Sequence, residues 1–413
     1  MPGRLISRTW TYDPASPAPP RYRRACRYEA FVPIPLADLA PAFSAEVAAA
    51  VSEAEDAIRR LNDGASPALG PLARLLLRTE SIASSRVEGL QSDVHDLARA
   101  EAKREMGRRV GREAEEILGN VNAMELALSE AAQAPAFSRG QVRAIHARLM
   151  ENALRPVSPG EFRTTQNWIG GNDYNPCGAD FVPPPPEYVD DLMDDLCEAI
   201  NSDVWSPLVQ AALVHAQFET IHPFDDGNGR TGRALVHVIL HRRSLAPAYV
   251  PPISVVLANH RDRYIRGLTG FREKGVAEWI EQFAEAATTS ARLAASYLEA
   301  VGRLQETWRG RLSATEKPPR RDAAAWAVID VLPAHPILSA AVAKVATGRA
   351  MSQVYQAIAQ LEDAGILVPL STSRRNRSWE ARGLLDLLAE LEAGNPPGPS
   401  DEPGSKSEGL LGR

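Results

Sequence analysis

The chain has 413 residues, and its 46 Lys and Arg residues against 52 Asp and Glu residues give a net charge of −6. With 44% hydrophobic and 24% charged residues, the composition is that of a globular protein and excludes wholesale disorder. No apolar run reaches the roughly 18 residues that a membrane span requires, and three scattered cysteines predict neither a disulfide framework nor a CxxC metal site. We therefore expect two or three domains in a cytoplasmic, reducing environment, with no membrane partner.

Prolines and arginines crowd the first 40 residues, as in PASPAPPRYRRACRYEAFVPIPL. Proline cannot occupy a helix interior, and it biases the residue before it towards extended geometry. We expect residues 1–40 to form an arm that wraps a domain and contains no element of its own.

A helical pattern follows from about residue 43 to residue 128. In EVAAAVSEAEDAIRRLN the apolar residues recur three and four positions apart, which is the period of a half-buried helix. The segment PLARLLLRTESIASSRVEG continues the pattern, with Pro71 suited to a helix start and Gly89 to a helix end.

The middle of the chain, about 138 to 294, is predicted to be helical around one long loop. SRGQVRAIHARLM, PLVQAALVHAQFETIHPF and TGRALVHVILHRR read as helices, and Pro223 breaks the second of them. A glycine- and proline-rich loop over 156–186 separates the first two, with a short hairpin expected in GADFVPPP. Loops of this length in compact domains usually serve a function.

The C-terminal region suits a winged helix-turn-helix. Ile337 to Ala346 is expected to be the first helix, Gly348 the turn and Ser352 to Ala364 the second helix, followed by a two-stranded wing. The wing segment 371–382 has four arginines against one glutamate, a charge that favours contact with DNA phosphates. A dimerisation or target-docking module is the alternative, and the polar tail 386–413 is expected to be disordered.

The richest chemistry lies in one loop, HPFDDGNGRTGR over 222–233. Gly227 and Gly229 let backbone N–H groups converge on one point, and the N-terminal dipole of the following helix is directed at the same point. Arg230 and Arg233 are three residues apart and share a face of that helix. A glycine nest, a helix dipole and two guanidinium groups together predict a polyphosphate site.

Two further side chains complete this loop. Asp226 offers a hard oxygen ligand of the kind that holds Mg²⁺ beside phosphates, and His222 at the rim is the natural general base. A metal-hydrolase site built from His215, Glu219 and His222 is disfavoured, because the spacing is not HExxH and Pro223 interrupts the helix.

The loop resembles the motif of Fic-domain proteins, HPFx[DE]GNGRxxR, at every defined position. TTQNWIGG, ADFVPPPP, HAQFETIHPF and HRDRYIRGL are also similar to Fic features and occur in the usual order, so the resemblance covers about residues 25–300. It implies an all-α fold, with a helical Fic core, a small β-hairpin flap and an appended winged helix. It also implies the transfer of AMP from ATP, with Mg²⁺, to a Ser, Thr or Tyr hydroxyl of a target protein.

The resemblance assigns roles residue by residue. His222 would deprotonate the target hydroxyl, and Asp226 would hold Mg²⁺ between the α- and β-phosphates. Val182 and Pro183 belong to the flap, which would align the target by main-chain pairing. The implied nucleotide-binding residues are Gly227, Asn228, Gly229, Arg230, Thr231, Gly232, Arg233 and, near the adenine, Tyr264.

The segment SSRVEG resembles the inhibitory motif of the family, [ST]xxxE[GN]. Ser84 and Glu88 are four residues apart and share a helix face. The resemblance implies that Glu88 pairs with Arg233 and takes the guanidinium that the γ-phosphate needs. A solvated helix end is the alternative for this segment.

Two functions remain open at this point. The first is a self-inhibited, Mg-dependent protein adenylyltransferase, which resemblance suggests could form a homodimer. The second is a DNA-binding regulator whose Fic core senses nucleotide with little turnover. The expected organisation is an arm over 1–40, an N-terminal helical domain over 41–118, a catalytic core over 119–300, a linker over 301–320, a winged-helix domain over 321–385 and a tail over 386–413.

Overall fold

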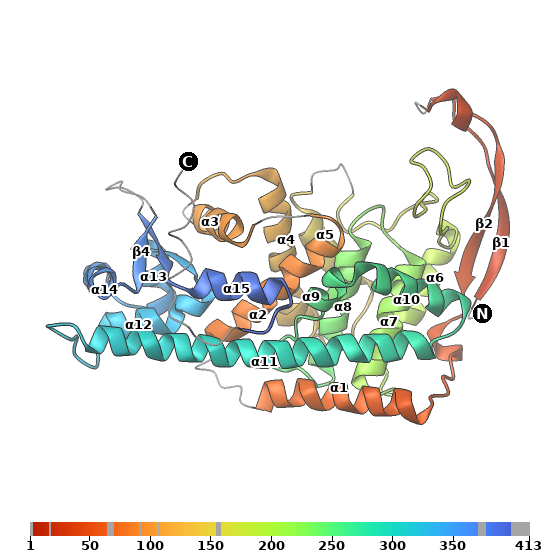
Figure 1. The fold of residues 1–413 in the computed structure, drawn as a ribbon. Helices are drawn as coiled ribbons and strands as arrows, with labels where there is room; N and C mark the ends of the chain where they lie inside the picture. The colour runs from red at the N-terminus through yellow and green to blue at the C-terminus, as the bar shows by residue number, and fades with distance from the viewer. Residues whose placement is uncertain are drawn as a thin grey trace, which may run out of the picture.

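The computed structural model describes residues 3–15, 18–63, 70–90, 93–105, 107–153, 158–370 and 377–397. Helices dominate, and the sheets are small, which confirms the all-α prediction. Figure 1 shows one long helix, α11 (Ala277–Ser313), running under most of the molecule from the core to the C-terminal unit. No helix in the described ranges is both long and apolar enough to cross a membrane.

The first 40 residues contain an element that the sequence analysis missed. Strands β1 (Gly3–Trp10) and β2 (Cys26–Pro33) form an antiparallel hairpin in which all eight residues of each strand are paired. The expectation of an arm without secondary structure is therefore wrong. The prolines between the strands lie in the connecting segment, so the only proline within the ladder is Pro33 at the end of β2. In Figure 1 the hairpin stands at one end of the molecule and projects beyond the helical body.

The predicted N-terminal helical region forms four helices, α1 (Ala45–Asp63), α2 (Gly70–Val87), α3 (Val94–Glu105) and α4 (Arg112–Leu126). Helix α1 packs along α11. Helix α2 is buried over most of its length, polar residues included, and Gly89 follows it with a φ of +88°. That left-handed conformation ends the helix at the position expected from the sequence.

The core is a helical bundle around two central helices. Helices α7 and α8 are buried on nearly every face and pack against each other. Helix α7 is apolar almost all round, whereas α8 begins with the polar segment NGRTGR, which is buried as well. Ser138 caps the helix that precedes them, in a capping box with Gln141. The core helices are α5 (Arg139–Met150), α6 (Val189–Asn201), α7 (Pro207–Ile221), α8 (Asn228–Arg242), α9 (Ile253–Asn259) and α10 (Arg261–Glu273).

The long loop between α5 and α6 has little regular structure in its described part. Where a hairpin was expected in GADFVPPP, a single antiparallel bridge joins Ile169 to Phe181. The prolines that follow Val182 supply no N–H groups, so the pairing cannot extend further along this segment. We call residues 168–183 the flap loop.

The C-terminal unit contains a helix, a turn and a second helix, α13 (Ala340–Thr347), Gly348 with a φ of +66° and α14 (Met351–Asp363). Residues 337–339, expected to begin the first helix, form strand β3 instead. β3 (Ile337–Ser339) pairs with β5 (Ser378–Ala381), which also pairs with β4 (Leu367–Pro369), so the sheet has three strands where two were expected. Helix α12 (Ala324–Val331) precedes the unit, and segment 371–376 of the predicted wing lies outside the described residues.

Two predicted boundaries are corrected. The expected linker 301–320 is helical as far as Ser313, because α11 continues into it. The expected disordered tail begins within α15 (Leu384–Glu392), whose leucines are buried on one face. Residues 398–413 of that tail lie outside the described residues.

Candidate functional site

The histidine of the predicted loop is held in an unusual backbone conformation. His222 follows α7 with φ 50° and ψ 59°, a left-handed geometry that non-glycine residues adopt at an energetic cost. Its carbonyl oxygen accepts hydrogen bonds from Arg163 Nε at 2.9 Å and from Asn167 Nδ2 at 3.2 Å. These buried donors over-determine the turn and direct the His222 ring away from the axis of α7.

Arg163 ties this turn to the flap loop. Its guanidinium donates to the carbonyl oxygens of Thr165, Pro184 and Ile221 as well as to His222. Burial lowers the pKa of Arg163 to about 10, so the side chain still carries its charge at neutral pH. One buried cation therefore fixes the spacing between the turn at His222 and the end of the flap loop.

The Asn228 side chain stabilises the loop through two hydrogen bonds to the backbone of Phe224. Its side-chain oxygen accepts from the Phe224 N–H at 2.9 Å, and its amide nitrogen donates to the Phe224 carbonyl at 2.8 Å. Phe224 is fully buried and lies flat on the ring of His146, with the ring centroids 3.6 Å apart. Asn228 thus acts on the loop backbone, and its amide is engaged inside the protein.

His146 is a supporting residue that the sequence analysis did not single out. Its Nδ1 accepts the Gly160 N–H at 2.9 Å, which leaves Nε2 to donate to the Asp226 carbonyl at 3.0 Å. Burial lowers the pKa of His146 to about 4, so the ring is neutral at pH 7 and keeps this tautomer.

Glu88 and Arg233 lie together, as the sequence implied. Arg233 donates to Ser84 Oγ, to the Ser84 carbonyl oxygen and, at 2.7 Å, to Glu88 Oε1. Burial alone would raise the pKa of Glu88, but the charge of Arg233 and its hydrogen bond outweigh this, so the pKa lies below its usual value. The Glu88 side chain is 39% exposed, so solvent weakens the pair relative to a fully buried one.

The Glu88 carboxylate also occupies the start of α8. A Cβ built on Gly229 would lie 1.9 Å from Glu88 Oε1, so the carboxylate oxygen rests directly against this glycine. Gly227, with a φ of +76°, caps the same helix end. The anion expected at this nest is therefore represented in the structure by the protein's own carboxylate.

The other predicted nucleotide-binding residues of α8 face the protein interior. Arg230 is buried and donates to Glu116 Oε1 at 2.8 Å, a partner that the sequence analysis missed. Thr231 is 1% exposed, and a Cβ on Gly232 would meet the ring of Phe218 at 2.9 Å. Thr231 and Gly232 therefore serve the packing of α8, and Gly232 allows α7 to approach closely.

Asp226 is the only predicted metal ligand, and the structure fits that role in part. Its Oδ1 accepts the Gly227 N–H at 2.7 Å, and the side chain is 37% exposed. No cluster of three or more His, Cys, Asp or Glu side chains suited to a metal occurs among the described residues. A single carboxylate matches Mg²⁺, which keeps most of its ligands as water and substrate phosphate.

The His222 ring is suited to accept a proton. Burial, followed by the charge of Arg163, lowers the pKa of His222 to about 4, so the imidazole is neutral at pH 7. Its Nδ1 is buried and has no hydrogen-bond partner in the described part of the chain. A neutral imidazole has a ring nitrogen that can accept a proton, and the lowered pKa makes it a weaker base than an ordinary histidine.

Tyr264 lies in the core. Only 4% of the residue is exposed, and its hydroxyl lies 2.9 Å from His215 Nε2. Burial raises the pKa of Tyr264, so the phenol stays protonated. The expected contact with adenine stays a prediction that this packed position does not favour.

The flap residues have their main-chain groups engaged. The Val182 carbonyl accepts the N–H of Phe31 in β2 at 2.9 Å, and the Pro183 carbonyl accepts Gln166 Nε2 at 3.0 Å. Phe181 exchanges its backbone bonds with Ile169. Pairing of a target strand with Val182 and Pro183 would therefore have to displace groups of the protein itself.

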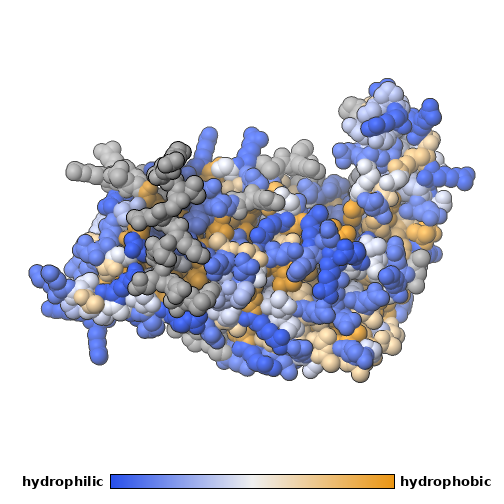
Figure 2. Space-filling view, viewed as in Figure 1, coloured by the Kyte–Doolittle hydropathy of each residue, from blue (hydrophilic) through white to orange (hydrophobic). Residues whose placement is uncertain are grey.

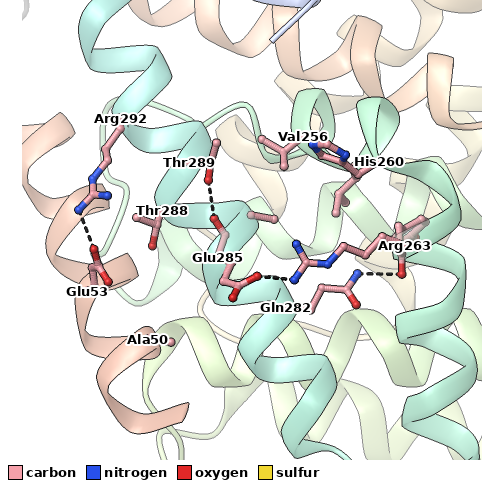
Figure 3. A pocket seen from close by; sticks show the side chains of 13 residues that line it. Ala50, Glu53, Val256, His260, Arg263, Gln282, Glu285, Thr288, Thr289 and Arg292 are labelled. Atoms are coloured by element: carbon pink, nitrogen blue, oxygen red, sulfur yellow. Dashed lines mark hydrogen bonds and ion pairs between the residues drawn. The ribbon is translucent and has the colours of Figure 1, made fainter. Parts of the chain in front are cut away.

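A separate pocket of about 360 Å³ lies between α1, α9, α10 and α11 (Figure 3). Its arginines are already paired, Arg292 with Glu53 at 2.7 Å and Arg263 with Glu285. Because these charges satisfy one another, the pocket offers no anion receptor comparable with the start of α8.

Comparison with known proteins agrees with this geometry. Residues 136–240 match the model of the Fic/DOC family, and residues 48–129 match the Fic/DOC family N-terminal model. The chain is 36% identical over 110 residues to protein adenylyltransferase fic-1 of Caenorhabditis briggsae, which covers 26% of this chain and 20% of that protein. It is 30% identical over 214 residues to protein adenylyltransferase Fic of Drosophila willistoni, which covers 49% and 37%.

Both alignments therefore span less than two fifths of the relative. Among solved structures, a Fic family protein from Desulfovibrio desulfuricans superposes with a TM-score of 0.51 at 22% identity, over 83% of this chain and 98% of that one. This likeness establishes the fold.

Proposed function

We propose that this chain, which carries a Fic domain preceded by a Fic N-terminal region, is a protein adenylyltransferase. It would transfer AMP from ATP to a Ser, Thr or Tyr hydroxyl of a target protein and of itself. The observation that carries the proposal is the contact of the Glu88 carboxylate with Arg233 and Gly229 at the start of α8, in the segment that begins with His222.

In this reaction the nest would hold the triphosphate at the start of α8. The His222 ring would take the proton of the target hydroxyl as its oxygen attacks the α-phosphorus. The new O–P bond forms, the bond between the α-phosphorus and its bridging oxygen to the β-phosphate breaks, and pyrophosphate leaves. Bound Mg²⁺, held by Asp226, would stabilise charge on the phosphates.

Self-inhibition follows from the position of Glu88. Its carboxylate takes a guanidinium nitrogen of Arg233 and rests on Gly229, where an anionic phosphate would bind. Two anions cannot share this place without strong repulsion. ATP would therefore bind poorly, or with its phosphates displaced, as long as Glu88 holds this position.

The first prediction tests this self-inhibition by Glu88, which we call the brake. Glu88→Gly removes the competing carboxylate, so self-modification with ATP labelled at the α-phosphate should rise at least about tenfold, equivalent to ~1.4 kcal/mol. Adding His222→Ala should abolish the signal, because the base is lost. Unchanged labelling in Glu88→Gly would argue against the brake, and persistent labelling without His222 would argue against the proposed chemistry.

A second candidate function is DNA binding by the C-terminal unit. Helix α14 exposes Gln353 and Gln356 beside Tyr355, which is 57% exposed, after a turn at Gly348. Polar side chains on an exposed second helix can contact base edges. A salt-dependent DNA shift by the intact chain, lost when these glutamines are changed to alanine, would support this function.

A further inference from the structure

The N-terminal hairpin is joined to the flap loop by its backbone. The Phe31 N–H donates to the Val182 carbonyl at 2.9 Å, and the rings of Phe31 and Phe181 lie 6.2 Å apart. Phe181 pairs with Ile169 on the other side, so this backbone bond holds β2 beside the flap loop. A target that approaches the flap from this side meets the hairpin first.

Side chains reinforce this junction away from Phe31. Trp10 packs edge-on against Trp168 at 5.5 Å, and Tyr22 stacks on Tyr174 at 5.1 Å. A disulfide links Cys26 of β2 to Cys177 in the flap loop. The pairing of these two cysteines, 151 residues apart, was not expected from the sequence. Hairpin and flap loop thus form one unit.

The exposed surface of the hairpin in this unit is basic, while the flap loop adds the exposed Asp173 and Asp180. Residues 1–33 contain six arginines against only Asp13 and Glu29, a local charge of +4 in a chain of net charge −6. All six guanidinium-bearing residues are exposed, namely Arg4, Arg8, Arg21, Arg23, Arg24 and Arg27. Figure 2 shows hydrophilic residues gathered on the projecting part of the hairpin.

Several of these arginines remain open to a partner. Arg8 pairs with Glu187 at 2.7 Å, and Arg23 donates to the Ala18 carbonyl. Within the described ranges, the side chains of Arg4, Arg24 and Arg27 make no hydrogen bond or ion pair. Arg24 and Arg27 lie at the end of the ribbon that carries the connection, together with the exposed Arg21, whereas Arg4 lies opposite Val32 near the other end. The cations at the connection end are complementary to carboxylates.

Building on the proposed function, we infer that this basic hairpin is the docking surface for the acceptor protein, and that it selects hydroxyls flanked by acidic residues. A protein segment fits better than a nucleic acid, because the aromatic rings of the hairpin are already packed on the flap loop. Trp10 and Tyr22 are partly buried and each contacts a ring of the flap loop, which reduces the ring surface open to stacked bases. The Val182 carbonyl is engaged by Phe31, so the arginine side chains are the groups offered to a partner.

The test measures binding to the full-length chain by fluorescence anisotropy, without ATP. Three labelled peptides share one threonine and differ only in flanks of glutamate, glutamine or lysine. We expect the glutamate peptide to bind about tenfold more tightly than the glutamine peptide at low salt, and the difference to shrink as salt is raised. The triple variant R21S/R24S/R27S should lose most of this preference.

The matched control is R60S/R320S/R321S, which removes three exposed arginines outside the hairpin and should keep the preference. Equal binding of the three peptides, or an equal loss in both triple variants, would overturn the inference. Displacement of the acidic peptide by a tighter-binding oligonucleotide would overturn it in favour of nucleic acid. Selective peptide binding without any labelling by Glu88→Gly would refute the proposed enzyme and leave the acidic docking surface standing.

Discussion

At the scale of single residues, Glu219 is a buried carboxyl group on which burial and the charge of Arg233 act in opposite directions. It lies on α7 one turn before His222, and its Oε1 is buried without a partner among the described residues. Burial raises the pKa of Glu219 to about 7, although the nearby charge of Arg233 opposes the shift. The carboxyl group is thus close to half protonated at neutral pH.

A third prediction concerns Glu219→Gln. Because the folded-state pKa is raised, protonated Glu219 contributes stability at low pH, and this contribution is lost as pH rises through about 7. Glutamine cannot ionise, so the variant should gain about 1–3 kcal/mol relative to wild type between pH 5 and pH 8.5. Urea unfolding at both pH values measures this difference, and an identical ΔΔG at the two values would contradict it.

A fourth prediction concerns the pH dependence of transfer. His222 has its pKa lowered to about 4, so its ring is unprotonated throughout the neutral range. Labelling by Glu88→Gly should therefore be nearly constant from pH 6 to 8 and should fall only as pH approaches 4, where the base becomes protonated. Initial rates at constant ionic strength test this, and a midpoint near 6.5 would show an unperturbed histidine instead.

Residues differ in how well the sequence predicts them. Ser84, Glu88, His222 and Arg233 belong to short motifs, and the structure brings Ser84 and Glu88 onto Arg233. Arg163, His146 and Glu116 support the same loop from 59 or more residues away. No local spacing marks such partners, because the tertiary fold alone decides which buried donor meets which carbonyl.

At the scale of elements, helix α2 is fixed by neighbours from the whole chain. Glu80 accepts from the backbone and the hydroxyl of Ser254 at the start of α9, and it lies 3.0 Å from His237 of α8. At the C-terminal end, Arg261 donates to the Val87 carbonyl, and Arg86 donates to the Glu392 carbonyl in α15. The position of Glu88 therefore depends on contacts that include the C-terminal unit.

A fifth prediction follows for Arg86→Met. The loss of the hydrogen bond to α15 should destabilise the chain by about 1–2 kcal/mol and should loosen the end of α2. Amide hydrogen exchange over residues 80–90 should become faster, and self-labelling should rise two- to fivefold or so. Arg60→Met, on the exposed face of α1, is the control. Equal behaviour of the two variants would show that α15 does not contribute to inhibition by Glu88.

Elements with a strong period were predictable, and those made by distant pairing were not. The amphipathic and all-apolar helices of the core follow from their spacing of three and four. The β1–β2 hairpin was hidden because its sequence is dominated by the prolines of the connection. The helix over 384–392 was also not predicted, because its short run of leucines is followed directly by a long polar segment.

At the scale of the whole molecule, α11 connects the regions that carry separate tasks. At its N-terminal half it packs on α1, α9 and α10, and at its C-terminal half it contacts α12, while α15 lies along it. Its 37 residues correspond to about 55 Å of continuous helix. A linker was expected over 301–320, and the first part of that range lies inside this helix. Burial of Trp308 and Leu312 instead extends the helix into the C-terminal unit.

The bond between Cys26 and Cys177 has a topological consequence. It closes residues 26–177 into a covalent ring that contains Glu88, whereas His222 and the arginines of α8 lie on the linear portion. A single proteolytic nick anywhere in that ring leaves both fragments tethered under oxidising conditions. A nick between Glu88 and Cys177 would therefore leave Glu88 and His222 in one band without thiol and in two bands with it.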